Sequence, residues 1–116
     1  MSRSNSLDNE LLTDAAYYIL LSLLIPRHGY GIMGYIEQLT DKEVAIGPAT
    51  AYTLIKKLLG SQYIVLSDEI DNERRKTYRI TEKGKRIVTD EIQRRSRMVQ
   101  HGLKALQSAE EESDHE

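Results

Sequence analysis

The chain has 116 residues, which is enough for one compact domain and an additional helix. It contains no cysteine, which excludes disulfides and thiolate metal sites, and its 40% hydrophobic content allows only a modest core. The formal net charge of −2 hides an asymmetry, because residues 74–104 carry eleven Lys or Arg against three acids, whereas residues 110–116 carry five acids. Local charge decides where a polyanion docks, so the near-neutral total does not exclude DNA.

The start of the chain, residues 1–10, is polar and rich in Ser and Asn, which predicts a flexible arm and no signal peptide. The longest apolar run, from Ile19 to Ile25, is interrupted by Ser22. It is far shorter than the roughly 20 residues that a membrane span needs. We therefore expect a cytoplasmic protein that has no membrane partner.

Two helices are predicted next. The first covers residues 11–25, with Thr13 as N-cap and Pro26 as terminator. Its residues at helical spacing are Ala16, Ile19, Leu20, Leu23 and Leu24. The second covers about residues 30–39, with Ile32, Met33, Ile36 and Leu39 inward. Gly29, Gly31 and Gly34 match G-x-G-x-x-G, but that dinucleotide fingerprint must follow a buried strand, and here a helix and a proline precede it. The glycines are better explained by a tight turn.

The residue pattern from Gly47 to Gly60 predicts a short helix around which the rest of the chain is organised. Pro48 suits its first turn, and Gly60 can close it through a left-handed residue. One face is apolar, with Ala51, Leu54, Ile55, Leu58 and Leu59; the other carries hydroxyls and ammonium groups, with Thr50, Thr53, Lys56 and Lys57. Such a helix fits a DNA major groove, although an ordinary amphipathic helix has the same pattern.

A β-hairpin is predicted after this helix. Residues 63–66 are β-rich, residues 68–73 form a polar turn, and residues 76–80 alternate so that Tyr78 and Ile80 share one face. The returning strand opens with three adjacent cations, Arg74, Arg75 and Lys76. Their mutual repulsion would be relieved by a phosphate backbone.

A long helix is predicted over residues 81–107, with Thr81 as its cap. Its apolar residues lie near heptad spacing, interrupted by Arg95, and are Val88, Ile92, Val99, Leu103 and Leu106. The domain is too small to cover a helix of this length, so the stripe predicts a homodimer interface, the alternative being a helix that folds back on its own domain. Residues 108–116 are predicted to form an acidic disordered tail.

The order of these elements is typical of a winged helix-turn-helix, mainly α with a small β-hairpin. We predict a DNA-binding domain over residues 11–80 and a dimerisation helix over residues 81–107. The predicted contacts with double-stranded DNA are Thr50, Tyr52, Thr53, Lys56 and Lys57 in the third helix, and Arg74, Arg75 and Lys76 in the wing. Lysines would take phosphates as point charges, while the start of the helix meets phosphates or base edges.

Several motifs in this order resemble those of PadR-like transcriptional regulators. Residues 28–32, HGYGI, are similar to the opening of that family's second helix, and residues 47–52, GPATAY, to the start of its recognition helix. Residues 74–84, RRKTYRITEKG, resemble its wing and the start of its last helix. The chain departs from the family pattern at Ala49 and Ala51, which replace Gly and Leu, and at Gln62, where a glycine is usual.

The resemblance implies a dimeric repressor that a small aromatic or hydrophobic effector releases from DNA, with the last helix forming the dimer. Tyr17, Tyr18, Met33 and Met98 are the residues available to such an effector. The alternative is a winged-helix module that binds another protein instead of DNA. We expect no enzyme, cofactor or metal site, because His28, His101 and His115 lie far apart and no nucleophile motif is present.

Overall fold

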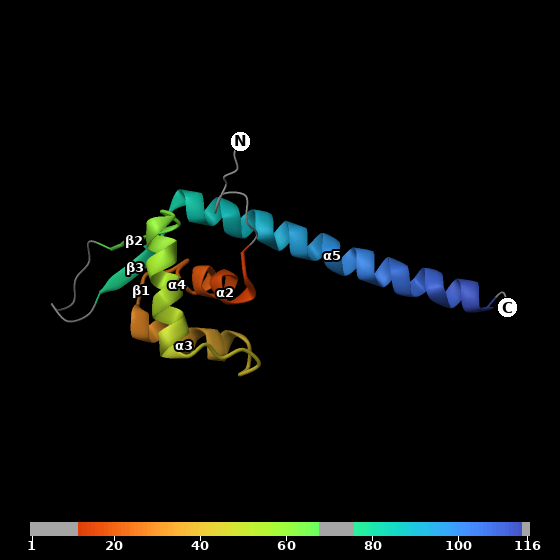
Figure 1. The fold of residues 1–116 in the computed structure, drawn as a ribbon, viewed down its shortest axis with the longest axis horizontal. Coiled ribbons are helices and arrows are strands. Elements are labelled where there is room, and N and C mark those ends of the chain that lie inside the picture. Colours follow the sequence, from red (N-terminus) through yellow and green to blue (C-terminus); the bar gives the residue numbers. More distant parts are fainter. Residues whose placement is uncertain (1–11, 68–75, 115–116) are drawn as a thin grey trace.

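The computed structural model describes residues 12–67 and 76–114. The predicted arm over residues 1–10, and Arg74 and Arg75 of the predicted wing, lie outside these ranges. The described elements are α2 (Asp14–Ser22), β1 (Arg27–His28), α3 (Gly29–Leu39), α4 (Pro48–Gly60), β2 (Ile64–Leu66), β3 (Thr77–Ile80) and α5 (Glu82–Asp114). Figure 1 shows α2, α3 and α4 packed together beside the strands, while α5 crosses this body and extends well beyond it. The result is an elongated molecule of 69 × 42 × 23 Å.

This arrangement is a winged helix-turn-helix with a long C-terminal helix, as the sequence predicts. The predicted two-stranded hairpin is, however, a three-stranded antiparallel sheet in the order β1-β3-β2. The additional strand β1 pairs Arg27 with Tyr78 and His28 with Thr77. It was missed because two residues are too few to show an alternating pattern, and a partner far along the chain supplies their hydrogen bonds.

The helix α2 begins as predicted but ends early. Thr13 is its N-cap, and the Thr13 hydroxyl accepts a hydrogen bond from the Ala16 N–H at 3.1 Å. The helix ends at Ser22, before Pro26, since the Leu23 carbonyl instead accepts a hydrogen bond from the Ile80 N–H at 3.1 Å. Leu24, one of the apolar residues at helical spacing, lies beyond this end and is exposed. The sheet, rather than the proline, sets this boundary.

One core holds these elements together. It is built from α2, α3, α4, the sheet and the first turns of α5, and its fully buried large hydrophobic side chains are Ile19, Leu20, Leu23, Ile32, Ile36 and Ile64. Val88 of α5 belongs to this core with only 3% of its surface exposed. The prediction that Val88 lies in a dimer interface is therefore wrong, because its own domain already covers it.

The connection after α4 places the left-handed residue two positions later than predicted. Gly60 lies within α4, and none of the glycines in the described residues has a positive φ. Gln62 adopts the left-handed conformation instead, with φ of 65°. This is the position at which the family pattern has a glycine, and a residue with a Cβ costs roughly 1–2 kcal/mol there.

The helix α5 is longer than predicted and is anchored by Arg95. It continues to Asp114, so the prediction that residues 108–114 are disordered is wrong in this structure. Arg95, which interrupts the heptad pattern, donates to Asp14 Oδ1 at 2.8 Å, to the Leu12 carbonyl at 3.1 Å and to Glu91 Oε1 at 2.9 Å. Its guanidinium also lies 4.4 Å from the centre of the Tyr17 ring. The polar interruption therefore ties α5 to the start of α2.

Candidate nucleic-acid interface

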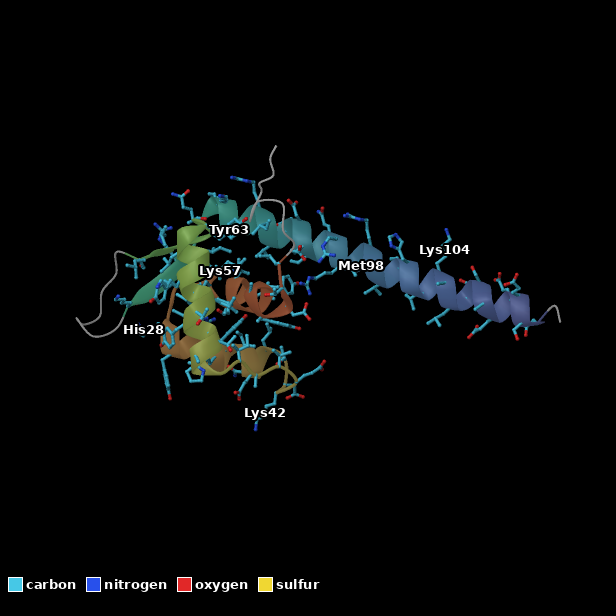
Figure 2. All side chains as sticks on the ribbon, in the orientation of Figure 1. His28, Lys42, Lys57, Tyr63, Met98 and Lys104 are labelled. Carbon is cyan, nitrogen blue, oxygen red and sulfur yellow. The ribbon has the colours of Figure 1, made fainter. Side chains whose placement is uncertain are left out.

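The two faces of α4 are separated as the sequence predicts. Ala51, Ile55 and Leu58 are buried against the core. The opposite side is exposed and holds every residue predicted to contact DNA from this helix, namely Thr50, Tyr52, Thr53, Lys56 and Lys57. Figure 2 shows Lys57 on the part of α4 beside the sheet, with Met98 and Lys104 far along the extended part of α5. Hydroxyls, an aromatic ring and two ammonium groups therefore line one outward face of a helix held by the core.

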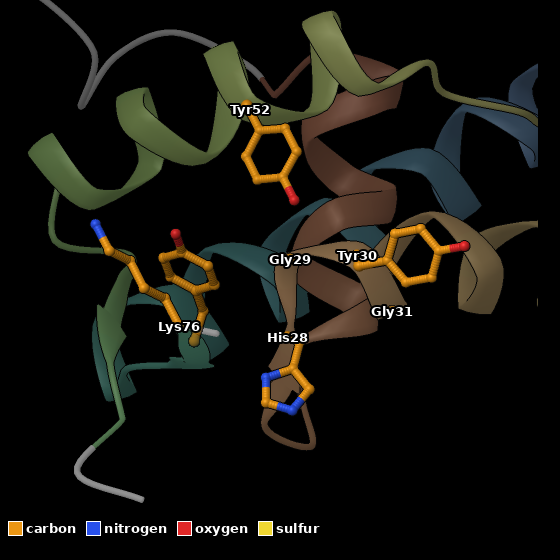
Figure 3. Close-up of a pocket in the computed structure, with 7 residues that line it drawn as sticks. His28, Gly29, Tyr30, Gly31, Tyr52 and Lys76 are labelled. Atoms are coloured by element: carbon orange, nitrogen blue, oxygen red, sulfur yellow. The ribbon is translucent and has the colours of Figure 1, made fainter. Parts of the chain in front are cut away.

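Tyr52 differs from its neighbours because its ring lies over the start of α3. A Cβ on Gly29 would lie 2.9 Å from both Cε1 and the hydroxyl oxygen of Tyr52. Figure 3 shows the Tyr52 hydroxyl directed toward Gly29, whereas Tyr30 points away from it. A glycine is needed at position 29 because a side chain there would collide with the Tyr52 ring, which lies over the start of α3.

Of the three cations predicted at the wing, the structure describes Lys76. Lys76 is exposed and immediately precedes β3, whose Arg79 is also exposed. Tyr78 and Ile80 lie on the opposite face of β3 and are buried, as their alternation predicts. Arg74 and Arg75, which complete the predicted basic cluster, lie outside the described residues; Lys76 itself lies just before β3 and lines a cleft with residues of α3 and α4.

A cleft of 510 Å³ lies where the wing, α4 and the start of α3 meet. It is lined by the turn from His28 to Gly31, by Tyr52, and by Lys76 and Tyr78 (Figure 3). Burial, and secondarily the electrostatic influence of the neighbouring Tyr52 phenol, raise the pKa of the Tyr78 phenol above its ordinary value. Sequence reasoning selected Tyr52 and Lys76 but missed Tyr78 and the turn, because only the fold brings β3 beside α3.

The remaining predicted dimer residues are exposed along α5. Ile92, Val99, Leu103 and Leu106 have between 47% and 66% of their surfaces accessible, and Met98 is similarly exposed. Beyond the contacts of its first turns, α5 has no other described element to cover this stripe. Exposed apolar side chains at this spacing on a projecting helix are typical of a helix–helix interface.

Within residues 12–67 and 76–114, no group of three or more His, Asp or Glu side chains is placed to hold a metal ion. A helix with the length and apolar character of a membrane span is likewise lacking among the described elements.

Comparisons with known proteins agree with this architecture. The model of the transcriptional regulator PadR-like family matches residues 19–90. A transcriptional regulator from Clostridium thermocellum shares 26% identity over 81% of this chain and 97% of its own, with a TM-score of 0.66. A PadR family transcriptional regulator from Eggerthella lenta shares 25% identity over 79% of this chain and 80% of its own, with a TM-score of 0.61.

Bacillus subtilis PadR, solved in complex with operator DNA, shares 25% identity over 66% of this chain, with a TM-score of 0.58. The matched region spans only 45% of that longer chain. None of the curated proteins matches the chain.

Proposed function

The chain belongs to the transcriptional regulator PadR-like family, and we propose that it binds specific DNA sequences as a dimeric repressor. The family is one of transcriptional regulators rather than enzymes, as the sequence predicts. The observation that carries the DNA-binding proposal is the exposed face of α4, where Thr50, Thr53, Lys56 and Lys57 lie opposite a face that is fixed in the core. A structural relative that contains operator DNA supports the same assignment.

In this proposal α4 lies in the major groove and the wing follows the adjacent backbone. The hydroxyls of Thr50 and Thr53 can reach base edges, while Lys56 and Lys57 neutralise phosphates. Lys76, together with Arg74 and Arg75, would lie along the backbone or minor groove next to α4. Phosphate contacts fix the position of the helix, and the side chains at its start supply sequence preference.

The charge contribution of α4 can be measured directly. Lys57→Ala should weaken binding to all duplexes alike and lower the slope of log K against log salt by about one, because one phosphate contact is lost. Fluorescence anisotropy of a labelled duplex at several salt concentrations gives this slope. Lys104→Ala, which removes the same charge from the extended part of α5, is the control and should retain the parent slope. Parent-like affinity and slope for Lys57→Ala would show that α4 does not dock as proposed.

A second copy of the chain is proposed to cover the stripe on α5. Two α4 helices related by a two-fold axis would then meet half-sites about one helical turn apart, which is the spacing expected of helix-turn-helix dimers. In this proposal the dimer occupies its operator within a promoter and acts as a repressor by excluding the polymerase.

The dimer has its own test. Leu103→Glu should convert the dimer into a monomer, because it places a charge in the middle of the apolar stripe that the second copy would cover. Sedimentation velocity reports the change in mass, and circular dichroism checks that the monomer remains folded. Gln107→Glu adds a charge to the same helix outside the stripe and should remain dimeric. A Leu103→Glu variant that still sediments as a dimer would remove α5 from the interface.

We also propose that a small aromatic or hydrophobic effector releases the protein from DNA by binding beside α2 and α5. The support is an aromatic surface at this junction, where Tyr17 and Tyr18 pack edge to face at 5.6 Å and Arg95 of α5 lies over Tyr17. A ligand that separates Arg95 from Tyr17 would change the angle of α5 and hence the spacing of two α4 helices. An effector should both raise the melting temperature and release bound duplex; compounds that do neither are not effectors.

A further inference from the structure

The start of α3 is a helix end with unsatisfied donors that opens into the cleft. His28 is its N-cap but makes no side-chain capping hydrogen bond, and the first turn contains no acid. The first N–H groups of a helix have no intrahelical acceptor and carry a partial positive charge. A Cβ on Gly31 would meet nothing within 4 Å, so the space beside Gly31 is open, whereas the Tyr52 ring lies over Gly29. Backbone donors are therefore available where the cleft is lined by Gly31.

An independent feature of the same cleft is the buried phenol of Tyr78. Its side chain lines the cleft although the residue is only 6% exposed. The described residues provide no hydrogen-bond partner for its hydroxyl. A buried tyrosine hydroxyl normally has a hydrogen-bond partner, since leaving it unpaired is unfavourable. The Tyr78 hydroxyl is thus available to form a hydrogen bond with a molecule bound in the cleft.

The charge of the cleft identifies the chemistry of that occupant. Lys76 is exposed at its edge, the Tyr52 hydroxyl reaches over Gly29, and none of the described residues that line it carries a carboxylate (Figure 3). Helix N–H groups, phenol hydroxyls and an ammonium group are all donors, and together they favour an oxyanion. A volume of 510 Å³ is larger than one such group requires, which leaves room for atoms attached on either side.

We propose that this cleft binds a phosphodiester of the DNA backbone, with the α3 N–H groups, the Tyr52 and Tyr78 hydroxyls and Lys76 as its donors. The inference rests on the proposed function and adds Tyr78 and the start of α3 to the surface that contacts DNA. A free inorganic phosphate has the same oxyanion chemistry. DNA is the favoured source because the cleft lies between α4 and the wing, the two elements that a continuous duplex backbone would touch, and because its size accommodates the neighbouring sugars.

Two substitutions in the cleft measure the contribution of the Tyr78 hydroxyl and that of the Lys76 charge separately. Tyr78→Phe removes one hydroxyl and should weaken duplex binding about fivefold without changing the salt slope, the loss expected for one hydrogen bond. Lys76→Ala should weaken binding and lower the salt slope by about one. Tyr35→Phe, which removes a hydroxyl on α3 from a residue that does not line the cleft, is the matched control and should bind as the parent does. Circular dichroism confirms that each variant is folded.

Replacing single phosphates of the duplex with uncharged linkages then shows which phosphate the cleft contacts. A single methylphosphonate, placed in turn at each position of a duplex, should weaken the parent at one linkage in each half-site. At that linkage it should have much less effect on Lys76→Ala, because the two changes remove the same interaction. Equal effects on parent and variant at all linkages would overturn the proposal.

The remaining outcomes distinguish this inference from the function on which it rests. If the parent binds DNA but Tyr78→Phe and Lys76→Ala bind equally well, the cleft is not a DNA contact and the proposed function stands. If the parent binds no duplex at low salt, the proposed function fails and the inference with it. If inorganic phosphate perturbs the Tyr78 ring resonances while both variants keep parent affinity for DNA, the site takes a free anion and the DNA source is overturned.

Discussion

Gly84→Ala should destabilise the protein by about 3 kcal/mol, because overpacking of this severity cannot be relieved by a small shift. A Cβ on Gly84 would lie 2.2 Å from the Tyr63 carbonyl oxygen and 2.6 Å from Ile80 Cγ1. The carbonyl is fixed in place, since it accepts hydrogen bonds from the Thr81 N–H at 3.0 Å and the Thr81 hydroxyl at 3.1 Å. The added methyl group must therefore push α5 away from the sheet.

The expected loss corresponds to a fall in melting temperature of more than about 10 °C for a domain of this size. Thermal and urea unfolding followed by circular dichroism measure it. Gly60→Ala is the matched control, because a Cβ there meets nothing within 4 Å and an alanine suits the last turn of α4. Its melting temperature should be unchanged or slightly higher. A Gly84→Ala variant as stable as Gly60→Ala would mean that α5 does not begin against Tyr63.

Glu91→Gln should destabilise the protein by about 2–3 kcal/mol, because it removes the buried carboxylate that Arg94 and Arg95 share and leaves Arg95 with Asp14 as its one described carboxylate partner. Glu91 is only 4% exposed and forms ion pairs with Arg94 and Arg95, each at 2.9 Å. Burial by itself would raise the pKa of Glu91, but hydrogen bonds from Arg94 and Arg95 outweigh it and lower the pKa below its ordinary value of 4.5. The folded state thus favours the charged carboxylate.

The sign of the pH dependence follows from that lowered pKa. Since the unfolded glutamate binds a proton more readily, the contribution of Glu91 to stability is fully present above pH 4.5 and is lost as the pH falls through the folded pKa. The melting temperatures of parent and Glu91→Gln should therefore differ most near neutral pH and converge in acid. Glu82→Gln removes an exposed partner of Lys85, 3.5 Å away, and should change stability little at any pH. A constant difference between parent and Glu91→Gln would contradict this account.

The sequence was sufficient to predict the elements whose signals are local. Pro48 at the first turn and apolar residues at helical spacing located α4, and Thr81 located the start of α5, where its hydroxyl accepts from the Gly84 N–H at 3.0 Å. These features depend on residues within one or two turns of each other. For the same reason the separation of Tyr78 and Ile80 from Arg79 could be read from simple alternation.

The features that sequence reasoning missed depend on contacts between distant segments. Arg95 looked like a defect in the heptad pattern, whereas its partners Leu12 and Asp14 lie at the other end of the chain. Strand β1 exists only because β3 pairs with it, and the cleft beside Tyr78 exists only because that pairing brings the wing next to α3. The end of α5 was misplaced for a different reason: its acids oppose the helix dipole, but Ala and Glu are strong helix formers and extend the helix to Asp114.

The central claim is that α4 and the wing read DNA, and an anisotropy titration tests it most directly. A labelled duplex from the region upstream of the protein's own gene is titrated at two salt concentrations, with a scrambled duplex of the same composition alongside. We expect tight binding that weakens steeply with salt and prefers the native duplex. Absence of binding to either duplex at low salt would contradict the account and would favour a winged-helix module that recognises another protein.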